Sequence, residues 1–241
     1  EISCSLVGSE MCIRDSNCRI QRINVCANDI TYREAKANNP LAHLYKLTPN
    51  LVENNDDFSY TWELFYLVIN NANKIIEGTV IPEDEEEATK FKAVLGEAYF
   101  LRGLSYFYLT RMYGKIPLIL KKDDAQITMP KSEVKDIYEK AIIPSLQTAC
   151  DYLPSKSRSG NSSTPTEWAA KACLTDVYLT MAGWPLKETK YYAEAEKVAL
   201  DIIKNSGLKL TTHYADLWKE ANKTQTNEFM FALHHLSLIH I

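Results

Sequence analysis

The segment from Gly96 to Leu120, GEAYFLRGLSYFYLTRMYGKIPLIL, constrains the fold most, because aromatic side chains are denser here than anywhere else in the chain. Arg102 and Arg111 interrupt the apolar run, whereas a membrane-spanning helix needs about 18 apolar residues with few or no charges. The consecutive aromatic residues 106–108 point in three directions on a helix and cannot form one flat surface. The segment is therefore predicted to be a buried scaffold helix.

The two ends of the chain resemble foreign sequence. Residues 11–16 (MCIRDS) can be written as ATGTGTATAAGAGACAG, and residues 236–241 (LSLIHI) can be written as the reverse complement of that string. Both strings resemble the transposase mosaic end used in sequencing libraries, and residues 6–10 (LVGSE) match the adapter arm that precedes it. Such segments carry no information about a fold. We expect residues 1–16 and 236–241 to be translated adapter, and residues 17–235 to be an internal part of a longer protein.

The composition favours a helical domain and gives no electrostatic reason to expect nucleic acid. The chain has 241 residues, of which 46% are hydrophobic, so it can bury a substantial core. Its 8 glycines and 9 prolines are few for a turn-rich all-β protein. The formal net charge of −4 becomes −2 when Arg14 and the three acidic side chains of residues 1–16 are left out. A near-neutral chain is not typical of nucleic-acid-binding proteins.

Between residues 17 and 235, the cysteines and histidines do not have the spacing of a metal-binding or catalytic motif. The cysteines and histidines of this range are Cys18, Cys26, Cys150, Cys173, His43, His213, His234 and His235. Neither set has the close pairing of zinc ligands, and Cys150 and Cys173 are expected to be buried small hydrophobic residues. The nucleophile-elbow, dinucleotide-binding and phosphate-loop motifs are absent from the sequence. We therefore predict no metal and no cofactor.

Apolar residues recur with helical spacing in five segments. The predicted helices are 60–78, 82–113, 132–153, 164–183 and 191–205. Pro82 followed by acidic residues is typical of a first helical turn, and Gly114 of a helix end. Pro144 is expected to kink the third helix. Thr164 to Glu167 (TPTE) is interpreted as a capping box with proline at the first helical position, and Asn227 to Leu233 as a strand.

Small residues at four-residue spacing, Ala195 and Ala199, are typical of tetratricopeptide-type helix pairs that pack closely, although the full repeat pattern is not reproduced. Three carboxylates, Glu63, Glu97 and Asp176, lie among apolar residues of predicted helices. Each could be a catalytic acid, but we favour buried or half-buried carboxylates paired with a base such as Arg102, because a lone buried charge is too costly.

Four blocks of the sequence together resemble the SusD/RagB family. They are Trp62 to Asn73 (WELFYLVINNAN), Gly96 to Leu120, residues 134–154 (VKDIYEKAIIPSLQTACDYLP), and residues 169–185 (AAKACLTDVYLTMAGWP) with the two segments that follow, 191–207 and 227–233. The positions that match the family's signatures and are expected to be structural are Trp62, Asn73, Glu97, Arg102, Tyr113, Gly114, Pro117 and Ala169. The chain departs from the family pattern at Gly103, where alanine is usual, and at Pro144-Ser145, where Asp-Leu is common.

The resemblance implies a mainly α fold, a tetratricopeptide-like helical-repeat scaffold with long loops, truncated here at both ends. Residues 17–235 would be the N-terminal and middle part of such a domain. Family members are surface lipoproteins of the outer membrane in Bacteroidetes-type bacteria, anchored by a lipidated N-terminal cysteine. They bind oligosaccharides or other nutrients and cap a TonB-dependent outer-membrane transporter. The resemblance thus implies a binding protein and not an enzyme, with no cofactor and no nucleic-acid partner.

The candidate ligand-binding residues lie in the polar segment from Asp29 to Phe58 and at one helix end. They are Tyr32, Arg33, His43, Tyr45 and Trp184, of types that stack on sugar rings or bind hydroxyl groups. Trp62, Trp168 and Trp218 are expected to be core residues instead. Two alternatives remain open at this point. One is a cytoplasmic tetratricopeptide-type adaptor that binds peptides in a concave groove, and the other is an enzyme of the α/α class with a carboxylate pair in a pocket.

Overall fold

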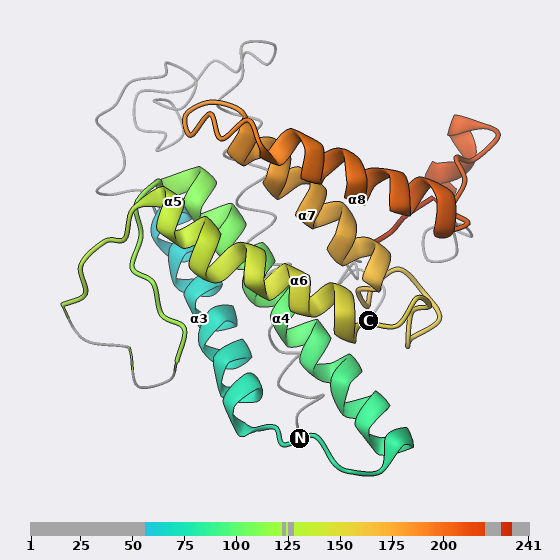
Figure 1. Cartoon of the computed structure of the whole chain (residues 1–241), viewed down its shortest axis with the longest axis horizontal. Helices are drawn as coiled ribbons and strands as arrows, with labels where there is room; N and C mark the ends of the chain where they lie inside the picture. The colour runs from blue at the N-terminus through green and yellow to red at the C-terminus, as the bar shows by residue number, and fades with distance from the viewer. Residues whose placement is uncertain (1–55, 122–123, 125–127, 220–227, 233–241) are drawn as a thin grey trace.

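The computed structural model describes residues 56–121, 124, 128–219 and 228–232 (Figure 1). Within these residues the chain is helical, which confirms the predicted mainly α, tetratricopeptide-like class. The elements are α3 (Asp56–Gly78), α4 (Glu85–Tyr113), α5 (Val134–Ile137), the π-helical turn η3 (Tyr138–Ile142), α6 (Ile143–Tyr152), α7 (Glu167–Ala182), α8 (Tyr191–Asn205) and the 3-10 turn η4 (Tyr214–Trp218). No helix of the described part is both long and apolar enough to cross a membrane.

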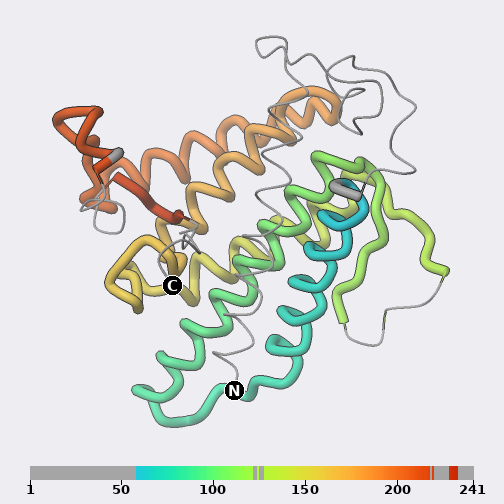
Figure 2. The backbone as a smooth tube through the Cα atoms, turned by 180° about the vertical axis from the view of Figure 1, so that it is seen from behind, coloured from blue at the N-terminus to red at the C-terminus, as the bar shows by residue number. Residues whose placement is uncertain are grey.

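The long helices pack in chain order, each against the next. Helix α4 contacts α3 on one side and η3 and α6 on the other, α6 contacts α7, and α7 contacts α8. Figures 1 and 2 show the same order from opposite sides, and successive long helices run in opposite directions. One continuous core joins them, from Phe65 in α3 to Ala195 in α8. This arrangement is that of helix-pair repeats, in which each element buries its apolar face on its neighbours.

Helix α4 begins three residues after the predicted start at Pro82. Asp84 is the N-cap, and its side chain accepts a hydrogen bond of 2.9 Å from the Glu87 backbone N–H. An aspartate cap satisfies a first-turn donor that Pro82 cannot satisfy, since proline offers no side-chain acceptor. The C-terminal end agrees with the prediction, because Gly114 follows the helix with a φ of +72°, a conformation that favours glycine.

The third predicted helix is one continuous run that widens before Pro144. The Ile143 backbone N–H donates to the Tyr138 carbonyl five residues earlier, which defines the π-helical turn η3. Proline has no N–H and its ring crowds the carbonyl of the preceding turn, and a wider turn accommodates both effects. The kink expected at Pro144 therefore takes the form of a π-helical turn directly before it.

The capping box predicted for Thr164 to Glu167 is wrong, because the N-cap lies two residues later and Ala169, not an acidic residue, is the third helical residue. Thr166 is the N-cap of α7 and accepts from the Ala169 N–H, while the first helical residue is Glu167 and not Pro165. The Glu167 N–H donates to the Pro154 carbonyl across the loop, so the first free donor of α7 is satisfied there. Helix α8 spans the predicted residues, and Gly207 just beyond it has a φ of +69°.

The strand predicted for Asn227 to Leu233 is wrong over the part that the structure describes. Residues 228–232 form a turn and bends, and no described strand lies beside them. Their backbone is tied instead to a loop, since the Ala232 N–H donates to the Ser162 carbonyl at 2.9 Å. Alternating apolar residues form a strand only where a neighbouring strand offers hydrogen bonds. Here the apolar side chains lie beside helices instead, and the Phe231 ring packs edge to face on Phe100 of α4 at 5.1 Å.

Candidate functional site

A buried polar cluster joins α3, α4 and α6. Arg102 Nη1 donates to Asn73 Oδ1 and Arg102 Nε donates to Ser145 Oγ, each at 3.0 Å. Asn73 Nδ2 donates in turn to the Ile119 carbonyl at 2.9 Å. Burial lowers the pKa of Arg102, whose guanidinium carbon also lies 5.0 Å from the centre of the Tyr99 ring. All of these groups are satisfied inside the scaffold, so the cluster holds three helices together and offers nothing to a ligand.

The extended segment after α4 is held by tyrosine hydroxyls. Tyr106 Oη donates to the Ile119 carbonyl and accepts from the Ile119 N–H, both at 2.8 Å. Tyr66 Oη donates to the Pro117 carbonyl at 2.7 Å. Burial raises the pKa of Tyr106 to about 12, so its hydroxyl keeps its proton as donor. Trp62 and Tyr113 pack edge to face at 4.9 Å, and Ala169 is buried, so these family-signature positions lie within the packed scaffold.

The carboxylate predictions are partly wrong. Glu97 is buried, with its side chain 4% exposed, but its base is Arg158 and not Arg102. Arg158 Nε and Nη2 donate to the two Glu97 oxygens at 3.1 and 3.0 Å, and desolvation raises the pKa of Glu97 against the opposing effect of Arg158. Glu63 and Asp176 are exposed, because they lie on the outer sides of α3 and α7. The three carboxylates do not share a pocket.

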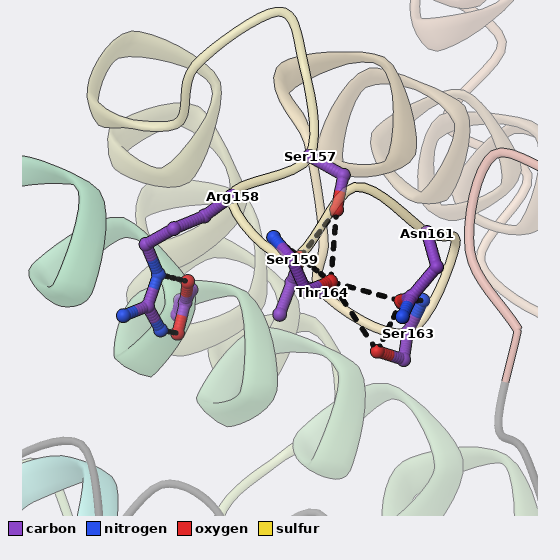
Figure 3. A network of polar contacts seen from close by, with 7 residues as sticks. Ser157, Arg158, Ser159, Asn161, Ser163 and Thr164 are labelled. Atoms are coloured by element: carbon purple, nitrogen blue, oxygen red, sulfur yellow. Dashed lines mark hydrogen bonds and ion pairs between the residues drawn. The ribbon is translucent and has the colours of Figure 1, made fainter.

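Next to the Glu97–Arg158 pair lies a loop rich in hydroxyl groups, residues 155–164, here called the serine loop (Figure 3). Thr164 Oγ1 is 2.6 Å from Ser157 Oγ and 3.0 Å from Ser159 Oγ. Asn161 Oδ1 accepts from Ser159 Oγ at 2.8 Å and from the Ser163 N–H at 2.9 Å. Figure 3 shows Arg158 pointing away from this cluster, so the salt bridge to Glu97 fixes the loop on α4 without using its hydroxyl groups.

The serine loop forms one wall of an open cavity of about 410 Å³, here called the serine-loop pocket. Its lining also contains Trp168 at the start of α7 and the side chains of Phe229 and Met230. A larger groove of about 780 Å³ lies between α6, α7 and α8 and is called the α8 groove. Lys171 lies in the α8 groove and bridges Glu167 at 3.2 Å and Asp201 at 2.6 Å, so ion pairs occupy part of that surface.

The structure does not bring the predicted ligand residues together. Tyr32, Arg33, His43 and Tyr45 lie outside the described residues, and their assignment stays a prediction. Trp184 is 79% exposed between α7 and α8, with Lys187 Nζ 4.9 Å from its ring centre. Trp62 and Trp168 are both half-buried. Trp62 packs against the hydrophobic core as expected, whereas Trp168 lines the serine-loop pocket, and the Trp218 side chain lies outside the described part.

Sequence reasoning missed Asn161 and Phe229 as neighbours of a pocket. The serine loop was interpreted only as a polar separator of two helices, since serine, glycine and asparagine are the common residues of any loop. The serine loop and residues 228–232 meet through the hydrogen bond from Ala232 to Ser162, which joins positions far apart in the sequence, and no local pattern predicts it. Within the described residues, no group of three or more metal-ligating side chains occurs, and Cys150 and Cys173 are free and half-buried. Burial raises the pKa of both thiols to about 12, as it does for inert packed cysteines.

Comparison with known proteins identifies the scaffold. The family model named SusD-like, described as "Starch-binding associating with outer membrane", matches residues 16–179. A SusD-like protein of Bacteroides ovatus is 34% identical over 184 residues, and SusD-like protein P2 of Formosa agariphila is 30% identical over 194 residues. These matches cover 73% and 78% of this chain but only 32% and 36% of the relatives, so the chain spans about a third of their length.

A solved structure has a similar fold. A crystal structure with a xylogluco-oligosaccharide superposes with a TM-score of 0.77 at 25% identity, and the match covers 98% of this chain and 46% of that one. The extent of the family match and the agreement of the helical stack lead to one conclusion: the chain belongs to the SusD-like family of starch-binding proteins associated with the outer membrane.

Proposed function

We propose that this chain is part of a cell-surface protein that binds oligosaccharides and passes them to a TonB-dependent outer-membrane transporter. The observation that carries the proposal is the family match over residues 16–179, which includes every helix from α3 to α6 and most of α7. The solved relative with a xylogluco-oligosaccharide supports a glycan rather than another nutrient. In this proposal the protein is anchored in the outer membrane by an N-terminal lipid and faces the outside of the cell.

The proposal assigns binding and no reaction to the protein. Among the described carboxylates, Glu97 is buried and bonded to Arg158, and Glu63 and Asp176 are exposed on separate helices. An acid–base pair for glycoside cleavage needs two carboxyl groups facing each other across one bond. The cytoplasmic peptide adaptor and the α/α enzyme are less consistent with the family membership, which concerns outer-membrane association.

The test has two measurements. The purified chain is titrated calorimetrically with a malto-oligosaccharide and a xylogluco-oligosaccharide, and we expect saturable binding of at least one of them. The lipid-anchored protein is then isolated from its native outer membrane by an affinity tag, and we expect a TonB-dependent transporter to copurify. If neither saccharide nor any member of a wider glycan array binds, the glycan part of the proposal is wrong. If the transporter does not copurify, the partnership is wrong.

A further inference from the structure

We propose that the serine-loop pocket binds one neutral glycosyl unit of an oligosaccharide. This inference rests on the proposed function and adds to it a location and a ligand class. The pocket has a volume of about 410 Å³, within the ~300–1,000 Å³ typical of ligand sites. Its lining combines hydroxyl and amide side chains of the serine loop, here called the polar wall, with the apolar side chains of Trp168, Phe229 and Met230, here called the apolar wall. These two kinds of side chain suit the hydroxyl groups and the C–H face of a sugar ring.

The polar wall is pre-organised by its own hydrogen bonds. Asn161 Oδ1 already accepts from Ser159 and Ser163, which fixes the orientation of the amide group. The Nδ2 group of the same side chain donates to no acceptor among the described residues, and Asn161 lines the pocket. A fixed amide with a free N–H is a suitable donor for a sugar hydroxyl, because little rotamer entropy remains to be lost on binding. The hydroxyls of Ser157 and Thr164 lie beside it.

The loop turns sharply just before Asn161. Gly160 has a φ of +72°, and a Cβ atom at this position would meet nothing within 4 Å. The Gly160 N–H donates to the Ser157 carbonyl at 3.2 Å, which closes the turn that precedes Asn161. The segment that carries Phe229 and Met230 is tied to the same loop by the hydrogen bond from the Ala232 N–H to the Ser162 carbonyl. This bond connects the two parts of the pocket lining.

The apolar wall contains aromatic rings. Phe229 is 37% exposed and lines the pocket together with Trp168 and Met230. The Lys171 Nζ atom lies 4.4 Å from the Trp168 ring centre, which orients that ring. Aromatic rings offer apolar faces that pack against the C–H face of a pyranose while the ligand hydroxyls bind elsewhere. This pairing of a ring wall with a donor wall distinguishes the pocket from an ordinary loop crevice.

The charge of the lining favours a neutral ligand. Among the described residues that line the serine-loop pocket, Lys156 is the only charged one, and it is exposed at the rim. The α8 groove differs, because Lys171, Lys197, Lys204, Asp151 and Asp201 all line it. Charged side chains would have to give up ion pairs or water to hold a neutral sugar, whereas hydroxyl and amide groups exchange water for sugar hydroxyls at little cost.

The test combines affinity with a site-specific signal. The chain is titrated with the malto-oligosaccharide or xylogluco-oligosaccharide that the wild-type protein binds, and NMR follows the Asn161 side-chain amide and the Trp168 indole N–H. Both signals are expected to shift with the same dissociation constant as the calorimetric titration. Phe229→Leu keeps an apolar side chain but removes the ring, and it should weaken binding about three- to tenfold. Asn161→Ala removes the donor and should weaken binding about tenfold.

Tyr192→Leu is the matched control, since Tyr192 is 51% exposed on α8 and does not line the serine-loop pocket. This variant also removes an exposed aromatic ring, and its affinity should stay within twofold of wild type. Thermal unfolding midpoints identify a variant that has lost its fold. If Asn161→Ala no longer folds, the affinity of Phe229→Leu and the NMR signals of the wild-type chain test the inference instead. The inference is wrong if the wild-type chain binds a saccharide, both pocket variants bind it with unchanged affinity, and the Asn161 and Trp168 signals do not shift. The proposed function would still stand in that case. A wild-type chain that binds no saccharide would contradict both.

Discussion

Single buried polar residues hold this scaffold together. Arg102 is a buried cation whose donors go to the neutral acceptors of Asn73 and Ser145 and whose charge lies over the Tyr99 ring. Asn73 is equally central, because its amide bonds both Arg102 and the Ile119 carbonyl. Loss of either partner leaves a desolvated group without a hydrogen bond, which costs more than the bond itself contributes.

Asn73→Ala is expected to destabilise the protein by about 2–4 kcal/mol, because it leaves an arginine donor and a backbone acceptor unsatisfied in the core. Urea unfolding followed by circular dichroism measures the change. Asn70→Ala on the same helix is the control, because Asn70 is exposed, and its effect should stay within about 0.5 kcal/mol. Equal losses in the two variants would contradict the role of the buried cluster.

Glu97 should make stability depend on pH. Desolvation raises its pKa above the ordinary 4.5, and Arg158 offsets this only in part. The folded protein therefore holds a proton on Glu97 at pH values where the unfolded chain has lost it. The stability that Glu97 contributes is complete below about pH 4.5 and falls as the pH rises through the higher folded pKa.

We therefore expect the stability of wild type relative to Glu97→Gln to fall as the pH rises from below 4.5 towards neutrality, since glutamine has no proton to lose. Urea unfolding of both proteins across this range measures the difference. If the stability of wild type relative to Glu97→Gln rises with pH instead, the ion pair with Arg158 outweighs the desolvation of the carboxylate. The comparison thus decides which of the two opposing effects dominates.

At the scale of elements, α4 and α6 approach each other through glycine. A Cβ atom at Gly103 would lie 2.9 Å from Leu146 Cγ, and one at Gly96 would lie 2.9 Å from Leu153 Cγ and 3.1 Å from the Leu153 backbone nitrogen. Leu146 therefore occupies the space that a methyl group at position 103 would need. The side chain of Leu146 can adjust, but the Leu153 backbone opposite Gly96 cannot.

Gly96→Ala is expected to destabilise the protein by about 1–2 kcal/mol, because overpacking of about 1–3 kcal/mol exceeds the gain of up to about 1 kcal/mol in helix propensity. Gly78→Ala is the control, since a Cβ atom there meets nothing within 4 Å, and it should be neutral or stabilising. Thermal unfolding measures both. A second substitution, Leu153→Val, should recover part of the loss if the contact is its cause, whereas additive effects would exclude that contact.

Sequence patterns predicted those elements whose signals are local. The bounds of α8 and the end of α4 at Gly114 follow from periodicity and helix-end chemistry, and both agree with the structure. The N-cap of α7 was misplaced because two threonines compete, and a distant bond from Glu167 to the Pro154 carbonyl selects Thr166. The partner of Glu97 and the serine-loop pocket depend on contacts between distant segments, which periodicity does not encode.

At the scale of the whole molecule, burial is uneven along the stack of helices. Helix α4 is packed on two sides and contributes many buried residues, including Leu95, Phe100 and Leu109. Helix α8 packs against α7, and only Ala195 and Ile202 of α8 are fully buried. Ile203 on the same helix is 75% exposed. In stacked helical repeats the stability of each element follows its interface with its neighbours.

Native-state hydrogen exchange should therefore show a gradient across the scaffold, with α4 amides exchanging only through global unfolding and α8 amides through a smaller, local opening. Mass spectrometry of peptides from α4, α7 and α8 at several low urea concentrations measures the opening free energies. Asn73→Ala should lower the opening free energy of the α4 amides by the full loss of global stability. The opening free energy of the α8 amides should stay unchanged, because α8 opens without breaking the Asn73–Arg102 hydrogen bond. Equal protection of α4 and α8, lowered together by Asn73→Ala, would instead mean that the helices from α3 to α8 unfold as one cooperative unit.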